Sequence, residues 1–424
     1  MVLSFSNWSR GALAAVSPHP MKFIVLLALA SIAAPLLAAP AAPTFKRTQI
    51  TSTFWSEGAC VADFNHDGKP DFAAGPYWYA GPDFKERHEF TAPPAKPFDG
   101  EKSYSDYFLT YAYDFDGDGW TDILVFTWPG KDASWYRNPG KGATGHWQKH
   151  VLMDEANGES PAIFDMNGDG KPELLAFSAG RLGFGEVDWK NPTAKATFRA
   201  ISPADPKKYF RYTHGYGAGD INGDGKPDIL EKDGWWEQPK DYRSGAEWKF
   251  HAFPFSPTGI RGGAQMLVYD VNGDGLNDVI TSWDAHGYGL AWYEQVRTGQ
   301  GDIGFQEHLL VNTKETDNPH GVKFTQPHAL VAADINGDGL MDFVTGKRFW
   351  AHGPAKDAEP GAPAVLYWFE LKRNGREAEF IPHLVDRDSG VGTQITVADL
   401  NGDGRPDILS SNKKGIHTFI QQKP

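Results

Sequence analysis

The chain has 424 residues and a formal net charge of −13, with 54 acidic side chains against 41 lysine and arginine residues. This acidic balance argues against a nucleic-acid partner, because binding to a phosphate backbone needs a basic surface. The aromatic content of 13%, the 47 glycines and the 30 prolines are typical of a large protein built from strands and tight turns.

The chain begins with a predicted export signal, assigned to residues 1–41. Met21 and Lys22 precede the apolar run FIVLLALASIAAPLLA, and small residues follow around Ala39, which is the pattern of a signal peptide. Met21 is an alternative start. The run is too short and too rich in alanine for a membrane span. We therefore expect a secreted or periplasmic protein without a stable membrane span, in which residues 42–424 form one domain.

A nine-residue pattern then recurs seven times: Asp, any residue, Asn or Asp, any residue, Asp-Gly, two residues, and Asp or Glu. Successive copies start 50 to 65 residues apart, at Asp63, Asp114, Asp165, Asp220, Asp270, Asp334 and Asp399. A period near 50 residues between short apolar segments predicts a propeller or another repeat array.

The repeat predicts calcium binding, because oxygen side chains at positions 1, 3, 5 and 9 of a tight turn can converge on one ion. Position 12 of the first copy is Ala74, so these are not EF-hands. Metal-free Asx-rich turns are the alternative, but the loops hold 22 of the 54 acidic residues, which favours up to seven Ca²⁺ sites. The predicted ligands are Asp63, Asn65, Asp67, Asp71, Asp114, Asp116, Asp118, Asp122, Asp165, Asn167, Asp169, Glu173, Asp220, Asn222, Asp224, Asp228, Asp270, Asn272, Asp274, Asp278, Asp334, Asn336, Asp338, Asp342, Asp399, Asn401, Asp403 and Asp407.

These repeats resemble the FG-GAP/VCBS repeats of integrin α-chain propellers and of many secreted bacterial proteins. The resemblance covers residues 45–424. It implies an all-β fold, a seven-bladed β-propeller with one calcium loop between strands A and B of each blade. Such propellers include adhesion modules as well as polysaccharide lyases, so the resemblance specifies the fold rather than the function.

Blade 6 gives the expected strand layout, with strands A to D at His328–Asp334, Asp342–Lys347, Val365–Leu371 and Phe380–Asp386. After the seventh loop only two further strands are expected before the sequence ends. The segment Phe45–Thr51 has the residue pattern expected of the missing fourth strand. We expect it to pair with Gly415–Gln421 and close the ring, which would leave no exposed sheet edge.

The longest loops are expected on the face opposite the calcium turns, at Thr91–Asp106, Ser202–Tyr212, Asn312–Pro327 and Arg348–Ala364. Polar residues that differ from blade to blade stand at the strand ends of this face. They predict a central pocket, with a solvated rim as the alternative. The candidate catalytic residues are His214, His286, His328, Lys347, Arg348 and His352, and the candidate substrate contacts are Glu159, Trp235, Trp283, Asp284, Gln265, Trp350, Gln394 and Lys413.

Tryptophans that recur once per blade are assigned to packing between blades, and Trp236 is placed in this group. Off-pattern tryptophans are candidates for stacking on a sugar: Trp55, Trp128, Trp235, Trp283 and Trp350. The candidate histidines come from the neighbouring blades 4, 5 and 6. They could bind a second, catalytic divalent metal, since imidazole suits transition metals. Separate hydrogen-bonding histidines are the alternative.

The segments SWDAHGYGLAWYEQ and QPHALVAADINGDGLMDFVTGKRFWAHG resemble the propeller part of fungal aldos-2-ulose dehydratase and related bacterial secreted propellers. That resemblance implies removal of water from a keto-sugar by β-elimination, assisted by a metal. Polysaccharide lyases perform the same elimination on uronic acids. Two functions therefore stay open: a monomeric carbohydrate-active lyase or dehydratase acting on a sugar or sugar-derived molecule, and a non-catalytic propeller that binds glycan or protein.

Overall fold

The computed structural model describes residues 42–423, so the predicted signal peptide at residues 1–41 lies outside the described residues. Within the described range the fold is all-β, as predicted. Its helical elements there are two 3-10 turns, η1 (Tyr242–Ser244) and η2 (Glu315–Asp317). No helix among residues 42–423 has the length and apolar character needed to cross a bilayer.

Most of the strands are short and separated by tight turns, as the density of glycine and Asx residues leads one to expect. In chain order they are β1 (Phe45–Thr51), β2 (Ala59–Ala62), β3 (Asp71–Ala74), β4 (Tyr77–Tyr79), β5 (Arg87–Glu89), β6 (Leu109–Tyr113), β7 (Asp122–Phe126), β8 (Lys131–Arg137), β9 (Gln148–Phe164), β10 (Glu173–Ser178), β11 (Arg181–Glu186), β12 (Thr197–Ala200), β13 (Tyr216–Gly219), β14 (Asp228–Glu231), β15 (Gly234–Glu237), β16 (Lys249–Ala252), β17 (Leu267–Tyr269), β18 (Asp278–Ser282), β19 (Leu290–Arg297), β20 (Ile303–Val311), β21 (Pro327–Ala333), β22 (Asp342–Lys347), β23 (Leu366–Asn374), β24 (Glu377–Asp386), β25 (Ile395–Ala398), β26 (Asp407–Asn412) and β27 (Gly415–Gln421).

Within residues 42–423 the strands form six antiparallel sheets. Five have four strands, and the sixth has seven, in the order β12-β11-β10-β9-β8-β7-β6. The long strand β9 explains the larger sheet, because residues 148–156 pair with β8 and residues 157–164 pair with β10. Strand β9 thus serves as the last strand of one four-stranded unit and the first strand of the next.

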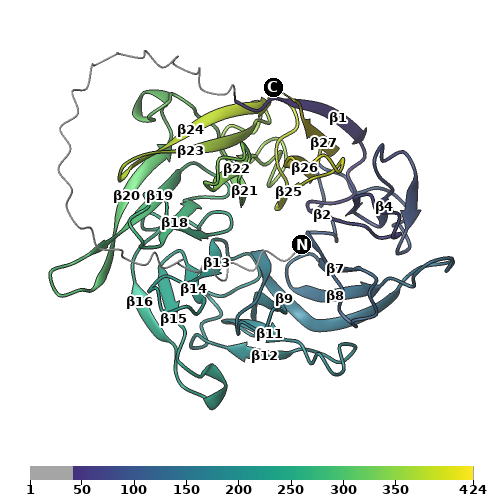
Figure 1. Ribbon diagram of the computed structural model, residues 1–424, viewed down its shortest axis with the longest axis horizontal. Coiled ribbons are helices and arrows are strands. Elements are labelled where there is room, and N and C mark those ends of the chain that lie inside the picture. Colours follow the sequence, from purple (N-terminus) through teal and green to yellow (C-terminus); the bar gives the residue numbers. More distant parts are fainter. Residues whose placement is uncertain (1–41, 424) are drawn as a thin grey trace, which may run out of the picture.

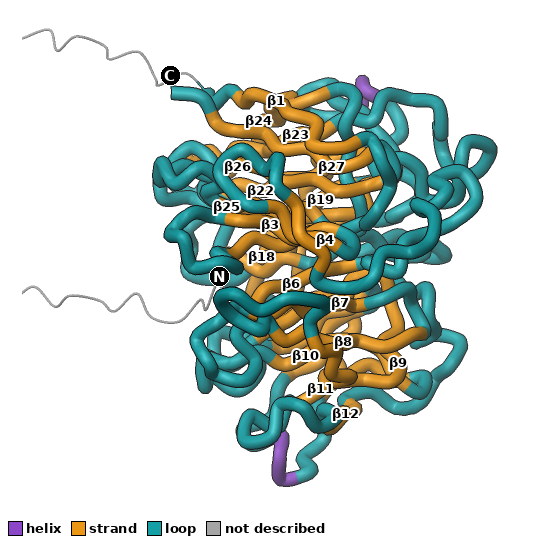
Figure 2. The backbone as a smooth tube through the Cα atoms, turned by 90° about the vertical axis from the view of Figure 1, so that its right-hand side faces the viewer, coloured by secondary structure: helices purple, strands orange, loops and turns teal. Residues whose placement is uncertain are grey.

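The sheets surround a common centre (Figure 1). The first strands of neighbouring units contact one another around this centre: β9 contacts β13, β13 contacts β17, β17 contacts β21, β21 contacts β25, and β25 contacts β2. In the side view, strands occupy the middle of the molecule and loops cover both faces (Figure 2). This arrangement confirms the propeller architecture expected from the repeats.

The two ends of the described chain meet in one sheet. Strand β1 pairs antiparallel with β27, from Phe45 opposite Gln421 to Thr51 opposite Ile416, and the sheet order is β1-β27-β26-β25. Both strands have the bounds predicted from the sequence. The N-terminal strand therefore completes the last sheet and removes its open edge.

In the described part of the chain the core consists of seven apolar clusters, and each lies between two neighbouring four-stranded units. One joins the last unit to the first: Leu409 and Ile416 pack against Phe72 and Ala74. Another joins the two halves of the seven-stranded sheet, where Phe126 and Trp135 belong to the same cluster as Leu174. Burial of apolar surface between the sheets is thus continuous around the ring, and it is the main stabilising contribution.

The tryptophan assignment needs one correction. Trp235 on β15 stacks on His251, with ring centroids 4.0 Å apart. The same tryptophan–histidine stack occurs at Trp292 and at Trp368. Trp235 therefore occupies the recurring position and packs between units rather than binding sugar. Trp236 also packs between units, in the neighbouring cluster, as predicted. The prediction for Trp235 was wrong because adjacent residues of a strand face opposite sides of the sheet, so a shift of one residue exchanges the two faces.

Candidate functional site

Four buried ligand-type side chains meet at the centre of the molecule. Glu159 lies in β9, His214 precedes β13, His286 lies in the loop between β18 and β19, and His328 is in β21. One side-chain atom from each lies within 4.8 Å of all the others. They come from four successive units, so only ring formation brings them together.

The short distances within this Glu–His cluster involve the same few atoms. The Nε2 atoms of His214 and His286 are 2.9 Å apart. Glu159 Oε2 is 3.0 Å from His328 Nε2 and 3.3 Å from His214 Nε2. The buried Nδ1 atoms of His214 and His328 have no hydrogen-bond partner. Three imidazole nitrogens and a carboxylate oxygen facing one point form a donor set that could hold a divalent transition metal.

Burial favours the neutral imidazole at His286 and His328. It lowers the pKa of His286 to about 3 and holds the pKa of His328 well below its usual value. Burial alone would raise the pKa of Glu159, but the neighbouring His214 and His328 hold it well below its usual range. Neutral imidazoles beside an ionised carboxylate are the protonation states that bind a metal.

A second carboxylate, Asp357, stands behind the histidines. Its Oδ1 accepts a hydrogen bond from His352 Nδ1 at 2.8 Å and lies 3.5 Å from His286 Nδ1. Its Oδ2 accepts a hydrogen bond from the backbone N–H of His352 at 2.8 Å. Because Nδ1 of His352 donates to the carboxylate, its Nε2 is left as a proton acceptor, as in other aspartate–histidine pairs.

Arg348 fixes the carboxylates on the other side of the cluster. Its guanidinium is 2.9 Å from Glu57 Oε1, donates from Nε to Glu57 Oε2 at 3.1 Å, and lies 3.5 Å from Glu159 Oε2. Both Arg348 and Glu57 are fully buried. The charge of Arg348 is therefore compensated within the protein by Glu57 and, at a longer distance, by Glu159.

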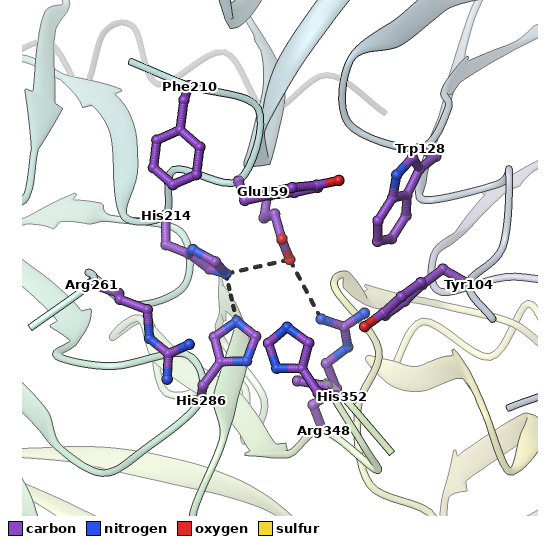
Figure 3. A pocket seen from close by; sticks show the side chains of 11 residues that line it. Tyr104, Trp128, Glu159, Phe210, His214, Arg261, His286, Arg348 and His352 are labelled. Carbon is purple, nitrogen blue, oxygen red and sulfur yellow. Dashed lines mark hydrogen bonds and ion pairs between the residues drawn. The ribbon is translucent and has the colours of Figure 1, made fainter. Parts of the chain in front are cut away.

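A cavity of about 410 Å³ opens above the cluster. Figure 3 shows His214, Glu159, His286, His352 and Arg348 converging on its floor, with Phe210 on the side of His214 and with Trp128 and Tyr104 on the opposite side. The residues lining it are Tyr104, Trp128, Glu159, Phe210, Tyr212, His214, Arg261, His286, Arg348, Ala351 and His352. Five of the predicted site residues thus share one pocket, and His328 lies directly beneath them.

Two predicted lysines lie outside this pocket. Lys347 donates from Nζ to Thr325 Oγ1 at 2.6 Å and to the carbonyl of Glu359 at 2.7 Å. It anchors the loop that carries Asp357, and burial lowers its pKa to about 8. Lys413 lies behind the wall of the pocket, with Nζ 4.4 Å from the ring centre of Tyr104, and burial lowers its pKa to about 8. Lys347 therefore does not face the pocket, and its assignment as a catalytic residue is wrong.

The two predicted glutamines connect inner strands instead of facing a ligand. The amide of Gln394 accepts from the N–H of Thr110 at 2.8 Å and donates to its carbonyl at 2.9 Å. Gln265 likewise donates to Thr393 and accepts from Leu330. Their polar groups are satisfied by backbone, which explains their position at the strand starts.

The remaining predicted contacts surround the site without lining it. Asp284 accepts from the N–H of His286 at 2.9 Å and so orients the histidine loop. Trp283 donates from Nε1 to the Tyr293 hydroxyl, and Trp350 donates to the carbonyl of Pro360. Neither tryptophan lines the pocket, so their assignment to sugar stacking is wrong.

Sequence reasoning missed four residues that line the pocket, Tyr104, Phe210, Tyr212 and Arg261, as well as Asp357 behind the histidines. All lie in long irregular loops, which carry no periodic pattern. The one available signal was their position in loops of the face opposite the predicted calcium turns, because functional side chains tend to lie in such loops. Trp128 was correctly placed among the aromatic residues of the site.

The acidic turns lie between the first and second strands of each unit, as predicted, but their carboxylates make a specific set of hydrogen bonds. In the sixth turn Asp334 accepts from the N–H groups of Gly337, Asp338 and Gly339. The last carboxylate, Asp342, accepts from two further backbone N–H groups. Burial raises its pKa to about 7. The ninth position is therefore a buried acceptor that ties the turn to the sheet, in addition to any role in calcium binding.

The second turn differs from the others. Among the acidic turns of residues 42–423, the second is the one in which three carboxylates lie within 4.8 Å of one another. They belong to Asp114, Asp116 and Asp122. Arg137 compensates part of this charge, with Nε 2.6 Å from Asp116 Oδ2. The second turn thus has the most convergent acidic oxygens for a calcium ion.

Replacing Asp342 with alanine is expected to destabilise the fold more than replacing Asp338. The Asp342 carboxylate accepts from Ile335 at 3.0 Å and Leu371 at 2.8 Å, and each orphaned buried N–H costs about 1–3 kcal/mol. Asp338 is exposed. In thermal melts, Asp342→Ala should lower Tm with and without calcium, whereas Asp338→Ala should lower it only when calcium is present. Wild-type melting of Asp342→Ala would contradict this role.

Comparison with known proteins identifies the repeat. The family model of the FG-GAP-like repeat matches residues 114–176 and 270–345. No curated protein sequence matches the chain. The structure of BBS1N in complex with ARL6DN is similar at a TM-score of 0.50 and 10% identity, over 90% of this chain and 97% of that chain.

Two carbohydrate-related structures show a weaker overall likeness. An Agrocybe aegerita lectin that recognises non-reducing terminal N-acetylglucosamine has 15% identity and a TM-score of 0.47, over 90% of this chain and 86% of that chain. Rhamnogalacturonan lyase YesW has 14% identity and a TM-score of 0.43, over 90% of this chain and 73% of that chain. At these levels the likeness concerns the fold.

Proposed function

We propose that this β-propeller with FG-GAP-like repeats is a secreted carbon–oxygen lyase that acts on an oxidised sugar in its central pocket. The observation that carries the proposal is the Glu159–His214–His286–His328 cluster. It forms the floor of a pocket that also holds a carboxylate-oriented histidine, His352. The substrate is a keto-sugar or a uronate, because β-elimination needs a carbonyl or carboxylate next to the carbon that loses its proton.

The architecture that we infer around this site is a seven-bladed ring. Counting β9 in two units gives seven four-stranded blades, and the seven apolar clusters then correspond to the seven blade interfaces. We further infer that calcium occupies the acidic turns and that residues 1–41 direct export. A calcium-rich extracellular or periplasmic environment would suit such turns.

The elimination needs a positive group at the enolate oxygen, a base and an acid. Glu159, His214, His286 and His328 would hold a divalent metal, which when bound supplies the positive charge that stabilises the enolate. Arg348 keeps Glu159 in place, and Asp357 lies against Nδ1 of His286. These outer contacts orient the ligands toward one point.

His352 is the proposed base. It lines the pocket, its side chain is 38% exposed, and Asp357 holds its Nδ1 proton. Its Nε2 therefore takes the proton from the carbon next to the carbonyl or carboxylate. The electron pair of that C–H bond forms the new C=C bond, and the C–O bond at the next carbon breaks.

Tyr104 is the proposed acid for the departing oxygen. It lines the same pocket, and burial raises its pKa to about 12, so the hydroxyl keeps its proton at neutral pH. In Figure 3 its hydroxyl points toward the guanidinium of Arg348 and the pocket interior. The departing oxygen takes the phenolic proton, which solvent replaces, and the products are an unsaturated sugar and water or a shortened glycan.

Enone formation tests this function directly. Wild-type protein loaded with zinc, manganese or magnesium is mixed with keto-sugars and with uronic-acid polymers, and absorbance of the unsaturated product is followed. Metal-dependent growth of that absorbance supports the proposal. Its absence across both substrate classes, in protein shown by calorimetry to bind the metal, contradicts it.

A non-catalytic glycan-binding propeller is the second candidate. It is favoured by two exposed aromatic side chains at the pocket entrance, Phe210 at 45% and Tyr212 at 39% exposure, because exposed aromatic rings mark binding surfaces. Retention on a glycan column without any turnover would support this alternative.

The substitution Asp357→Asn is expected to lower turnover by about 10- to 100-fold, because an amide no longer fixes the Nδ1 proton of His352. The same change should weaken metal affinity through His286. The measurements are kcat as a function of pH and a metal competition titration. Asp357→Glu, which keeps the carboxylate, should restore part of both. A variant with unchanged kcat, pH profile and metal affinity would exclude a positioning role for Asp357.

A further inference from the structure

Four aromatic rings form a continuous arc from the pocket to the surface. Tyr104 lies against Trp128 with ring centroids 4.2 Å apart, Trp128 is 5.8 Å from Tyr212, and Tyr212 is 6.1 Å from Phe210. We call these four residues the aromatic arc. All four line the cavity, and Figure 3 shows the labelled rings of Tyr104, Trp128 and Phe210 around the Glu–His cluster.

Exposure increases along the arc. Tyr104 and Trp128 are partly buried, whereas Tyr212 is 39% and Phe210 is 45% exposed. Its inner end thus lies beside the charged floor of the pocket, and its outer end faces solvent. A ligand confined to the floor of the pocket, beside the Glu–His cluster, would leave the exposed faces of Phe210 and Tyr212 in water, at the free-energy cost that exposed apolar surface carries.

The loops that carry the arc are held in place. The carbonyl of Arg211, between Phe210 and Tyr212, accepts from Gly158 at 3.0 Å, and the Thr213 hydroxyl donates to the carbonyl of Lys208 at 2.7 Å. The guanidinium of Arg211 packs over Gly130, next to the turn of Trp128, where an added Cβ would lie 3.0 Å from Arg211 Cζ. The backbone that carries Phe210 and Tyr212 is therefore held in place, which lowers the entropy lost on binding.

The chemistry around the arc favours a saccharide over an apolar ligand or a lipid. Sugar rings have apolar C–H faces that pack on aromatic rings and hydroxyl edges that need polar partners. The arc offers the flat rings, while Arg211 lies over the ring of Tyr212 at 6.0 Å and the exposed Arg261 lies across the cavity, 3.7 Å from Asp284. Aromatic surface with a few convergent polar groups is the usual composition of such sites.

We propose that the aromatic arc is a subsite for the second and third rings of an oligosaccharide whose terminal residue occupies the pocket. This inference rests on the proposed function in so far as the pocket takes a sugar. It specifies that the ligand is a chain end rather than a free monosaccharide. The arc extends over three ring-to-ring steps, which exceeds the span of one sugar ring.

Calorimetry with defined oligosaccharides tests the proposal. The probes are galacturonate oligomers of one to four units and cello-oligomers of the same lengths, and the protein is the full metal-loaded chain. Wild type should bind three units at least about 10-fold more tightly than one in at least one series, since the second and third sugar rings would pack on the aromatic arc. In Phe210→Ala/Tyr212→Ala protein this ratio should fall to near one.

A matched control is Phe250→Ala, which removes another exposed aromatic ring, on β16 and outside the cavity lining. It should leave the length dependence unchanged. Equal affinity for one and three units, binding of neither series, or preferential binding of an aromatic peptide would overturn the proposal. Because binding is measured, the length dependence remains observable in His352→Ala protein. A failure of the lyase function is thereby separated from a failure of the subsite.

Discussion

Deletion of residues 42–52 is expected to destabilise the entire chain rather than one sheet. The deletion removes β1, whose six register pairs with β27 close the ring. It also removes Phe45 and Ile50, which pack against two different apolar clusters. With backbone hydrogen bonds worth about 1 kcal/mol each and additional apolar burial, the loss is on the order of 5–10 kcal/mol.

Thermal melts of a chain starting at Thr53, compared with one starting at Ala42, measure this effect. A point variant serves as an independent check. Gly415 has φ +104°, and a Cβ added there would lie 2.0 Å from the carbonyl oxygen of Thr51. Gly415→Ala should therefore separate the end of β1 from β27 and lower Tm in the same direction. If the truncated chain melts like the longer one, the closing strand contributes nothing to the fold.

Replacing His328 with alanine is expected to remove both tight metal binding and turnover. His328 is fully buried, and its Nε2 shares Glu159 with His214. Loss of one of four ligand atoms should weaken metal affinity by more than the roughly 10- to 100-fold typical of lost outer contacts. Turnover should fall by at least ~10²–10⁴, the range for loss of a catalytic group.

The control for this variant is His308→Ala on β20. His308 also pairs with a glutamate, Glu294 at 2.8 Å, and stacks on Trp292, but it lies far outside the Glu–His cluster. His308→Ala should lower Tm and leave metal affinity unchanged. Metal competition titration and enone absorbance give the two readouts. Equal loss of metal affinity in both variants would mean that the central histidines bind no metal.

Much of the architecture could be predicted because its signals are local. The acidic turns recur with their glycines at fixed positions, and strand β22 has the predicted bounds, Asp342–Lys347. The pairing of β1 with β27 followed from a count of strands, since a ring with one strand missing at its end needs a partner from its start. In these cases the backbone conformation is set by a few neighbouring residues.

The site was predictable only in part. His214, His286 and His328 departed from the blade pattern, and this departure identified them. Lys347 and Arg348 also departed from the blade pattern. The Arg348 guanidinium lies near Glu159, whereas Lys347 donates to the carbonyl of Glu359. Adjacent residues at a strand end point in different directions, and the sequence does not tell which of them faces the centre.

The sequence by itself therefore determined the repeat, the turns, the strand pairing and the set of polar residues at the strand ends near the central pocket, because each depends on short-range patterns. Only the tertiary structure decided which side chains meet. Glu159, His214, His286 and His328 are contributed by four different units, and Tyr104, Trp128, Phe210 and Tyr212 by three different loops. Their juxtaposition depends on ring closure and loop conformation, which are set by long-range packing and leave no periodic trace in the sequence.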